Sequence, residues 1–378
     1  MSRQWILASQ EGFENSLQYQ ENVKIPSPKD IKPNEVLVKI HAASLNYREI
    51  QIADPHVRKF SAVQHIFLML SEVLMQGING PIMPPIVPGG DGAGVVVAVG
   101  PSVQEFQPGD RVITFLGPKL AEKGGDDALP GISDAVAMMG QGSDGTLRSV
   151  GVFTEKALVH APRFLNWLQA ATLPCTWTTA WNALFGVEGK KAGPGTWVLV
   201  QGTGGVSIAT LQLAVAAGAT VVATTSTEER EARLKALGAA YTINYRSSPD
   251  SWGQKAKEFT PGGRGFDIIV DVGGNETLPQ SLAAIRVDGT VVLGGAVGGK
   301  SKPVVLFEAF MHTCWVRGII LGSRNQLKQV VRYIDAKGIK PAVDDIVFEL
   351  VEAKEAYRRL NEKKHFSKVV IRVDHPFD

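Results

Sequence analysis

A glycine-rich segment is the first part of this sequence whose residue types and spacing could do chemistry. Residues 202–207, GTGGVS, follow an apolar run that ends at Gln201 and lead into a helical pattern. Gly202 permits a tight turn, Gly204 lets the backbone approach a pyrophosphate, and the helix N-terminus offers unpaired N–H groups. Ser207 stands where a third glycine would allow close helix–strand packing, and a small serine serves there. The segment predicts a dinucleotide phosphate site, against the alternative of a tight turn without a ligand.

The end of the following strand indicates which dinucleotide the segment favours. An acidic residue roughly 20 residues beyond the turn would bind the ribose 2′-hydroxyl of NAD, but residues 224–227 are Thr, Thr, Ser and Thr. Glu228 and Glu229 fit the first turn of the next helix, where acidic side chains favour the dipole. Arg230 and Arg233 lie close by, and hydroxyls beside a guanidinium suit a 2′-phosphate. We therefore predict NADP, with the alternative that Arg230 is a solvated helix residue.

Strand-like and helical patterns alternate around this turn. Apolar runs lie at 197–201, 220–225, 241–245, 267–271 and 291–295, and helical patterns lie at 208–217, 228–237, 250–259 and 277–285. Such alternation is typical of βαβ units, and right-handed crossovers then give a doubly wound parallel sheet.

The flanking parts of the chain have another character. Short β-rich runs such as 35–43, 88–100 and 106–113 are separated by Gly and Pro, which predicts a small barrel-like β domain. Residues 325–336 are helical, and the strand-like run 369–373 has no βαβ context, so we expect it to return to the first domain. The predicted division is therefore 1–175 and 323–378 for the catalytic domain, and 176–322 for the dinucleotide-binding domain.

Residues 58–77 carry apolar side chains at helical spacing with polar ones on the other face. This pattern predicts an amphipathic helix. The helix either packs on the body of the protein or forms a lid or pocket wall over an apolar substrate.

Composition excludes several classes of protein. The chain has 39 basic and 37 acidic residues, a net charge of +2, and no polybasic run, which disfavours a nucleic-acid or membrane-surface binder. Two cysteines exclude a disulfide framework and a four-cysteine zinc site. No signal peptide or membrane span is visible, and we expect a cytoplasmic protein.

Several further segments, in this order, carry a resemblance. They are SLNYRE at 44–49, PGGDGAG at 88–94, GDRV at 109–112, Leu173-Pro174 with Thr179-Ala180-Trp181, INYR at 243–246 and FDIIVDVGG at 266–274. Together they resemble the medium-chain dehydrogenase/reductase superfamily, and within it the zinc-free quinone oxidoreductase-like branch. The resemblance covers nearly the whole chain.

The resemblance implies an α/β protein, with a Rossmann doubly wound parallel sheet and a GroES-like, β-barrel-type catalytic domain. It implies that Thr179 holds the nicotinamide carboxamide, that Gly204, Gly205 and Val206 meet the pyrophosphate with Gly202, and that Lys368 approaches it. Ser226, Arg230 and Tyr245 would surround the 2′-phosphate. Gly273, Gly295, Ala296, Val297, Leu321, Gly322 and Ser323 would line the rest of the cofactor site.

The sequence departs from the superfamily in two places. The first concerns the chemistry: the zinc-dependent branch places a Cys where Asn46 lies and a His-Glu pair at Gly90-Asp91, so we expect no catalytic zinc here. Cys175 is expected to be a small buried side chain. The second departure is local. The segment from about 54 to 83 is longer than the connector that the resemblance implies, so the resemblance carries least weight in that segment.

Without zinc there is no Lewis acid to stabilise an alkoxide. Reduction of a conjugated C=C bond needs only a held geometry, hydrogen-bond donors for the enolate and a proton for the α-carbon. The resemblance implies that Asn46 approaches the nicotinamide ribose and substrate. Tyr47 and Arg48 are the nearest candidate donors in sequence: Tyr47 could donate the proton, and Arg48 could polarise a carbonyl. The alternatives are that Tyr47 packs in the core and that Arg48 makes a structural ion pair.

These observations predict an NADPH-dependent reductase of enones, quinones or enoyl thioesters, acting on a small apolar carbonyl-conjugated substrate. A zinc-independent alcohol or aldehyde oxidoreductase and a low-turnover NADPH-binding sensor or structural protein remain as alternatives. A homodimer through the strand around 315–321 is also implied by the resemblance, although a monomer is plausible.

Overall fold

The computed structural model describes residues 2–54, 80–82, 84–297 and 302–373. Contacts divide the chain into two compact units, Met1–Thr178 with Ser323–Asp378 as the first and Thr179–Gly322 as the second. The amphipathic helix predicted over 58–77 lies outside the described residues. No helix in the described part of the chain has the length and hydropathy that a bilayer span needs.

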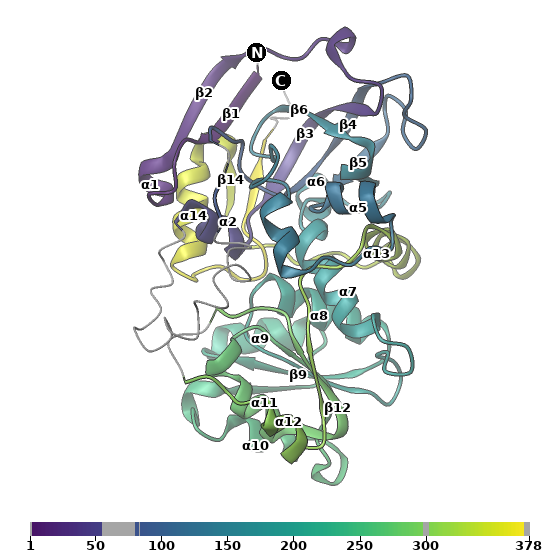
Figure 1. Cartoon of the computed structure of the whole chain (residues 1–378). Helices are drawn as coiled ribbons and strands as arrows, with labels where there is room; N and C mark the ends of the chain where they lie inside the picture. Colours follow the sequence, from purple (N-terminus) through teal and green to yellow (C-terminus); the bar gives the residue numbers. More distant parts are fainter. Residues whose placement is uncertain (1, 55–79, 83, 298–301, 374–378) are drawn as a thin grey trace. The chain divides into compact units, whose positions relative to one another are not determined.

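The first unit is built mainly on antiparallel strands, and only the pair β14–β15 of its described strands is parallel (Figure 1). Its main sheet has the order β14-β15-β3-β4-β5-β7, with β6 also pairing with β3, and β1 and β2 form a separate ribbon. The strands are β1 Ser2–Leu7, β2 Leu17–Val23, β3 Glu35–Ser44, β4 Asp91–Val99, β5 Arg111–Thr114, β6 Val150–Thr154, β7 Leu158–His160, β14 Val347–Glu349 and β15 Val370–Arg372. The helices are α1 Phe13–Ser16, α2 Tyr47–Ala53, α5 Pro118–Gly124, α6 Trp167–Ala170, α13 Arg324–Lys337 and α14 Ala353–Asn361.

The long strand β3 is the centre of this unit. It pairs with β4 with two register shifts, which bend the sheet. At Gly94 a Cβ atom would lie 2.1 Å from the carbonyl oxygen of Lys39, so only glycine allows the two strands to approach this closely.

The C-terminal strand β15 returns to the first unit. It pairs antiparallel with β3, with Val370 opposite Ser44, and Ser44 is in turn opposite Asp91 at the start of β4. Three strands that are far apart in the sequence therefore meet at one end of the sheet, with Asn46, Asp91 and Lys368 at or just beyond their termini.

Helix α13 fixes the returning chain through a buried arginine. Arg324 is fully buried, and its guanidinium donates to the carbonyl oxygen of Leu158 and to the carboxylates of Glu105 and Asp126. The ammonium groups of Lys156 and Lys328 reach the same two carboxylates. Burial alone would raise the pKa values of Glu105 and Asp126. Hydrogen bonds and charge from these cations outweigh it and hold both values at about 2.

This network makes the stability of the first unit sensitive to acid. Both carboxyl pKa values are lower in the folded than in the unfolded chain, so the stabilisation is complete at neutral pH. It is lost as pH falls from about 4.5 towards 2. We expect Arg324→Met to cost about 3 kcal/mol at pH 7, because it leaves two carboxylates with fewer partners, and to flatten the acid dependence.

Urea unfolding followed by tryptophan fluorescence at pH 7 and pH 3 tests this expectation. Lys364→Met is the matched control, because its ion pair with Glu362 is exposed and should contribute little. Equal losses of stability for the two variants at pH 7 would contradict a stabilising role for the network.

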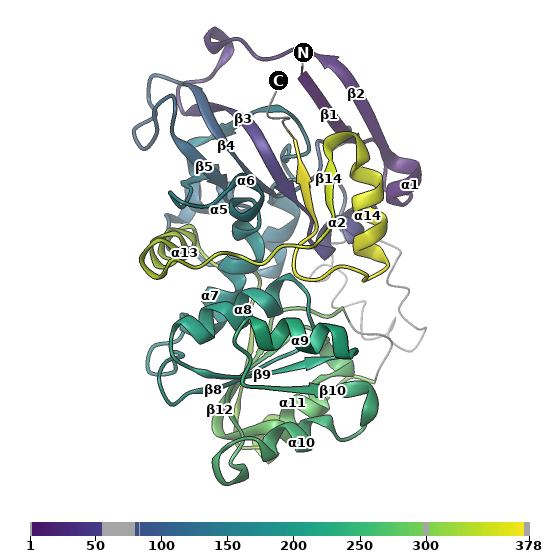
Figure 2. The same ribbon diagram turned by 180° about the vertical axis from the view of Figure 1, so that it is seen from behind.

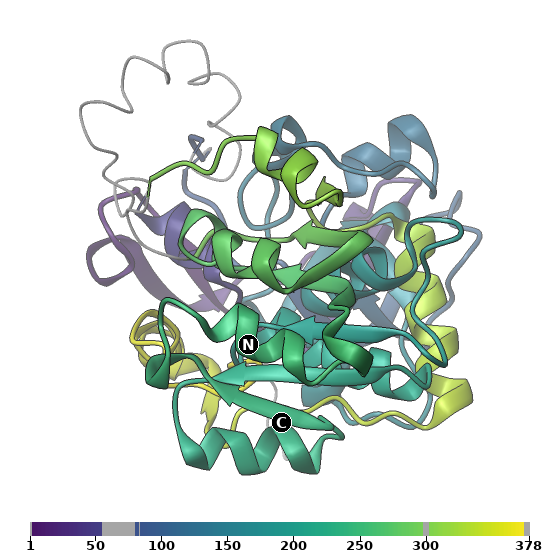
Figure 3. The ribbon, with the colours of Figure 1, turned by 90° about the horizontal axis from the view of Figure 1, so that it is seen from below.

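The second unit is a parallel sheet with the order β10-β9-β8-β11-β12-β13. Its strands are β8 Trp197–Val200, β9 Thr220–Thr225, β10 Tyr241–Asn244, β11 Phe266–Asp271, β12 Ile285–Leu293 and β13 Trp315–Gly318. Its helices are α7 Thr178–Phe185, α8 Gly205–Ala216, α9 Glu228–Ala236, α10 Trp252–Glu258, α11 Leu278–Ala284 and α12 Phe307–Met311. Helices α8 and α9 cover one face, and α10 and α11 pack together on the other (Figures 2 and 3).

The predicted doubly wound sheet is confirmed, with one difference in a strand boundary. β12 begins at Ile285 rather than at 291, because the strand contains a register shift beside Asp288, whose φ is +57°. The chain runs outward through β8, β9 and β10 and then reverses direction through β11, β12 and β13. The carboxyl ends of β8 and β11 therefore form the switch point at which such sheets bind ligands.

Candidate functional site

The glycine turn lies at the switch point of the second unit. Gly202 has φ +72°, and its N–H lies 3.1 Å from the carbonyl oxygen and 3.0 Å from the hydroxyl of Thr224. Apart from its chain neighbours, no described residue has an atom within 4 Å of where a Cβ of Gly202 or Gly204 would lie, and no side chain in the described part of the chain caps the N-terminus of α8. The open space above uncapped N–H groups fits a dinucleotide pyrophosphate.

A buried carboxylate holds the turn in place. Asp271, at the end of β11, accepts hydrogen bonds from the side chains of Gln201 at 3.1 Å and Ser281 at 2.6 Å. Its other oxygen accepts from the backbone N–H groups of Gly273 and Gly274. Ser207 is buried and donates to the carbonyl oxygen of Gln201 at 2.6 Å, as its packing position predicts. The sequence reasoning assigned no role to Asp271 or Gln201, although Asp271 lies inside one of the segments that carry the resemblance.

The residues predicted around the 2′-phosphate lie at neighbouring strand ends. Thr225 of β9 is opposite Asn244 of β10, so Ser226 and Tyr245 follow paired positions. Arg230 lies in the first turn of α9, which begins after the N-cap residue Thr227, and it is partly exposed. The fold brings all three predicted residues to one edge. The exposed Arg246, next to Tyr245, adds a second guanidinium that the prediction did not include.

Two loops of the second unit place the residues predicted on the nicotinamide side. The N–H of Val297 donates to the carbonyl oxygen of Val272 at 2.9 Å, so residues 272–274 and 294–297 lie together. Thr179, in α7, lies 3.8 Å from where a Cβ of Gly294 would be. This places Gly273, Gly295, Ala296, Val297 and Thr179 in one region.

Leu321, Gly322 and Ser323 lie where the chain leaves the second unit. Leu321 is buried, has φ +58°, and accepts a hydrogen bond on its carbonyl oxygen from the amide of Asn182 at 2.8 Å. Ser323 belongs to the first unit, where its hydroxyl caps α13 by accepting from the N–H of Gln326. The cap uses the hydroxyl oxygen as an acceptor, so it is compatible with a hydrogen bond that the same hydroxyl donates to a cofactor.

A second polar group lies in the first unit, and we name it the Asn46 cluster: Ser44, Asn46, Asp91 and Lys368. All four side chains are buried, with 8% or less of each residue exposed. One oxygen of Asp91 accepts from the Ser44 hydroxyl, the Asn46 amide and the Lys368 ammonium, each at 3.0 Å. Lys368 also donates to the amide oxygen of Asn46 and, at 2.6 Å, to the carbonyl oxygen of Leu45. The structure therefore brings Lys368 to Asn46.

The adjoining helix α2 carries Tyr47, Arg48 and Glu49. The Arg48 guanidinium donates through Nη1 to the carbonyl oxygen of Met139 at 2.9 Å and to Glu49 at 3.2 Å. Its Nε and Nη2 atoms are buried and have no hydrogen-bond partner among the described residues. Glu49 accepts from the backbone N–H of Asn46 at 2.7 Å, and its burial raises its pKa in spite of Arg48. Arg48 thus combines the predicted structural ion pair with two unpaired guanidinium nitrogens among the described residues, and we name these Nε and Nη2 atoms the open edge of Arg48.

Tyr47 and Cys175 have less defined roles. Tyr47 is the first residue of α2 and is partly buried. Burial raises the pKa of the Cys175 thiol to about 12, with the Asp91 carboxylate acting in the same direction. Cys175 is therefore a neutral thiol at pH 7 and a poor nucleophile.

Two family models match the sequence over most of its length. One describes an alcohol dehydrogenase GroES-like domain and covers residues 32–167, and the other describes a zinc-binding dehydrogenase and covers residues 205–336. A zinc-type alcohol dehydrogenase-like protein of Schizosaccharomyces pombe is 37% identical over 353 residues, which are 92% of this chain and 93% of the relative. The chain belongs to the medium-chain dehydrogenase/reductase superfamily. As in the superfamily, a GroES-like domain accompanies a Rossmann-type sheet, so the predicted fold class is confirmed.

Solved structures of other medium-chain dehydrogenases/reductases agree in fold and differ in chemistry. An NAD-dependent alcohol dehydrogenase has a TM-score of 0.80 at 30% identity, covering 98% of this chain and 100% of that one. The 2-octenoyl-CoA carboxylase reductase CinF, in complex with NADP and 2-octenoyl-CoA, has a TM-score of 0.80 at 26% identity, covering 98% and 87%. The chain is therefore an oxidoreductase of this superfamily. Because its relatives differ in cofactor and acceptor, those two properties must be argued from the residues of the site.

The donor set of the Asn46 cluster does not fit the zinc ion of the superfamily's metal-dependent branch. The side chain at 46 is an amide, residue 90 is glycine, and the Asp91 carboxylate is paired with the Lys368 ammonium. An ammonium at this place repels a cation. No group of three His, Cys, Asp or Glu side chains among the described residues is arranged to hold a metal. We therefore derive no step through zinc.

Proposed function

We propose that this protein is an NADPH-dependent reductase that transfers hydride to an activated C=C bond or a quinone, without zinc. Enones, quinones and enoyl thioesters form the acceptor class. The observation that carries the proposal is the open edge of Arg48: two buried guanidinium nitrogens, Nε and Nη2, that have no hydrogen-bond partner among the described residues. They lie beside an amide-based cluster, where the superfamily's other branch uses a metal. Burying a donor unpaired costs free energy, so such an edge fits an oxygen atom of a substrate.

The residues of the first unit suit the needs of conjugate reduction. When bound, the nicotinamide supplies a hydride to the β-carbon, and the π electrons of the acceptor move onto its carbonyl oxygen. The N–H groups of Arg48 donate hydrogen bonds to this enolate oxygen and lower the energy of the transition state. The α-carbon then takes a proton, for which Tyr47 is the candidate donor. If Tyr47→Phe leaves kcat unchanged, Tyr47 is dropped from this role and water takes its place.

Two features support NADP as the coenzyme. Ser226, Arg230 and Tyr245 share one edge of the second unit, and no acidic residue ends β9. CinF, a superfamily member of the same fold, was solved with NADP and an enoyl thioester. The alternative of a zinc-independent alcohol or aldehyde oxidoreductase is favoured by the alcohol dehydrogenase-like name of the Schizosaccharomyces pombe relative.

Oxidation of NADPH against a panel of quinones, enones and enoyl thioesters tests the proposal, with NADH in parallel. We expect turnover with at least one acceptor class and a preference for NADPH. NADP reduction by alcohols that persists with a chelator would support the alternative enzyme. Tight NADPH binding without hydride transfer to any acceptor would instead indicate a low-turnover NADPH-binding protein.

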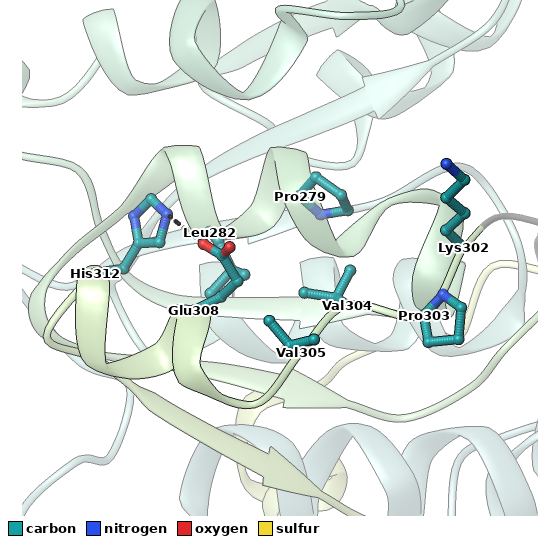
Figure 4. A pocket seen from close by; sticks show the side chains of 8 residues that line it. All are labelled: Pro279, Leu282, Lys302, Pro303, Val304, Val305, Glu308 and His312. Atoms are coloured by element: carbon teal, nitrogen blue, oxygen red, sulfur yellow. Dashed lines mark ion pairs between the residues drawn. The ribbon is translucent and has the colours of Figure 1, made fainter. Parts of the chain in front are cut away.

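We also propose that two copies associate through the β13 edge of the second unit. β13 ends the sheet, and large apolar side chains are exposed on and around α12; they include Leu306 at 82%, Phe310 at 72% and Trp315 at 55%. A hollow of about 370 Å³ lies on one side of α12, lined by Val304, Val305 and the Glu308–His312 pair among others (Figure 4). A second, of about 580 Å³, lies beside Phe310 and Trp315. In a twofold dimer the same patch lies on both partners, so we expect the apolar projection of one copy to fill a hollow of the other.

Sedimentation of a Phe310→Asp variant tests this association. A buried carboxylate at such an interface should shift the protein from dimer to monomer and weaken self-association at least about 100-fold. Val351→Asp, a similarly exposed apolar position in the first unit, is the control and should leave the mass unchanged. A wild-type protein that sediments as a monomer at all concentrations would contradict the proposal.

A further inference from the structure

The Asn46 cluster fixes the direction in which the Asn46 amide points. In the sheet, Ser44 is opposite Val370 on one side and opposite Asp91 on the other. This register places Lys368 and Asp91 at opposite ends of the Asn46 amide. The Lys368 ammonium donates to the amide oxygen, and the amide nitrogen donates to Asp91 at 3.0 Å. A flipped amide would place its N–H groups against the ammonium and its oxygen against the carboxylate. Only one orientation is therefore compatible with the two charges.

All three hydrogens of the Lys368 ammonium are committed within this cluster. Their acceptors are the carbonyl oxygen of Leu45, the amide oxygen of Asn46 and the carboxylate of Asp91. Only 2% of Lys368 is exposed. A phosphate contact from this lysine would break one of these charge-assisted bonds, so the pyrophosphate role that the resemblance implies competes with the observed geometry.

Asn46 keeps one donor unused. An amide nitrogen carries two hydrogens, and only the bond to Asp91 is observed for it among the described residues. Asn46 is 8% exposed, so the second N–H is nearly buried and its direction is set by the first. The second N–H of Asn46 is therefore a fixed hydrogen-bond donor. It lies near Arg48, because the Arg48 guanidinium and the backbone N–H of Asn46 both donate to Glu49.

We propose that Lys368 and Asp91 are positioning residues that clamp the Asn46 amide, so that its second N–H is directed at the oxygen of the acceptor. This inference rests on the proposed function. According to this inference, Lys368 affects turnover by orienting Asn46 and does not itself bind the cofactor. The clamp needs both charges: the ammonium fixes the oxygen end of the amide, and the carboxylate fixes the nitrogen end.

A double-mutant cycle between Lys368 and Asn46 tests the clamp, with kcat measured on the best acceptor and the Kd of NADPH measured by fluorescence titration without acceptor. We expect Lys368→Met to lower kcat about 10- to 100-fold and to leave the Kd of NADPH within about twofold. In an Asn46→Ala background the same substitution should lower kcat less than about threefold, because the residue through which it acts is gone. Lys368→Arg keeps a charged donor and should recover part of kcat.

The outcomes separate the possible roles of Lys368. A rise of 10-fold or more in the Kd of NADPH for Lys368→Met, restored by Lys368→Arg, overturns the clamp in favour of a pyrophosphate contact. Additive losses of kcat in the cycle also overturn it, because a general structural role does not depend on Asn46. If Lys368→Met fails to fold, the pair Lys368→Met with Asp91→Leu removes both charges together, and this pair takes the place of the single substitution in the cycle with Asn46→Ala. A wild-type protein that turns over none of the acceptors removes the proposed function and the clamp with it, whereas turnover with additive losses overturns the clamp alone.

Discussion

Replacing Gly204 by Val should abolish or severely weaken cofactor binding while leaving the fold intact. Apart from the chain neighbours, no atom of the residues that the structure describes lies within 4 Å of a Cβ at this position. Its φ of −77° and ψ of 173° are in the β region that valine prefers. The valine methyl groups would instead occupy the space above the N-terminus of α8, where a phosphate must approach the backbone N–H groups. We expect the Kd of NADPH to rise at least about 100-fold, which corresponds to about 2.7 kcal/mol. Calorimetric titration measures it.

Gly193 provides the matched control for this variant. It also lies in a turn of the second unit with no atom within 4 Å of a Cβ, but it is not at the switch point. Gly193→Val should bind NADPH like the wild type, and both variants should keep the melting temperature within a few degrees. Unchanged affinity in Gly204→Val would show that the pyrophosphate does not lie over this turn, and the proposed cofactor site would be withdrawn.

Removal of the Arg48 guanidinium should cause the largest loss of turnover. Arg48→Met deletes the two open N–H donors, and loss of a donor to a developing oxyanion costs about 100- to 1000-fold in kcat. Arg48→Lys should recover little of this loss, because an ammonium is a point charge without the paired Nε and Nη2 hydrogens. The Kd of NADPH should stay near the wild-type value in both variants. Steady-state kinetics with the acceptor found in the panel measures the effect.

Arg148→Met is the control for Arg48→Met, because it also removes a buried guanidinium. It shows how much of the loss of kcat comes from removing any buried cation of the first unit. Arg148 is also a buried arginine of the first unit, and its Nε has no partner within the described ranges. Its guanidinium bonds to Asp144 and packs over Phe153, and neither residue belongs to the Asn46 cluster. We expect it to lower stability and to leave kcat within about threefold. If both arginine variants lose the same share of kcat, Arg48 has no special part in the reaction.

The sequence was most informative where structure is local. The glycine turn, the strand Thr220–Thr225 and the helix at 324–337 depend on neighbouring residues, and their patterns predicted them closely. β12 was predicted too short because its first part contains a register shift that periodicity does not show. Parallel strands bring their carboxyl ends to one edge, and so Ser226 and Tyr245 could be predicted as neighbours from the strand assignments and the resemblance.

The Asn46 cluster was not predictable in the same way. Asn46 and Asp91 are 45 residues apart, and Lys368 is 277 residues beyond Asp91. Their contact depends on the registers of three antiparallel strands, and a one-residue slip would turn each side chain to the other face. The resemblance alone assigned Lys368 to the pyrophosphate. Arg324, whose carboxylate partners lie 198 and 219 residues away, escaped prediction for the same reason.

The return of β15 to β3 has a consequence for how the protein is made. The second unit is one continuous stretch, Thr179–Gly322, and all of its strands are available once that stretch has left the ribosome. The first unit begins to be synthesised earlier, yet its sheet lacks β14, β15 and the Lys368 partner of Asn46 until the segment from Val347 to Arg372 has emerged. The nascent chain therefore completes the unit with the proposed cofactor site before the unit that contains the Asn46 cluster. If the proposed function holds, turnover must wait until β15 has left the ribosome.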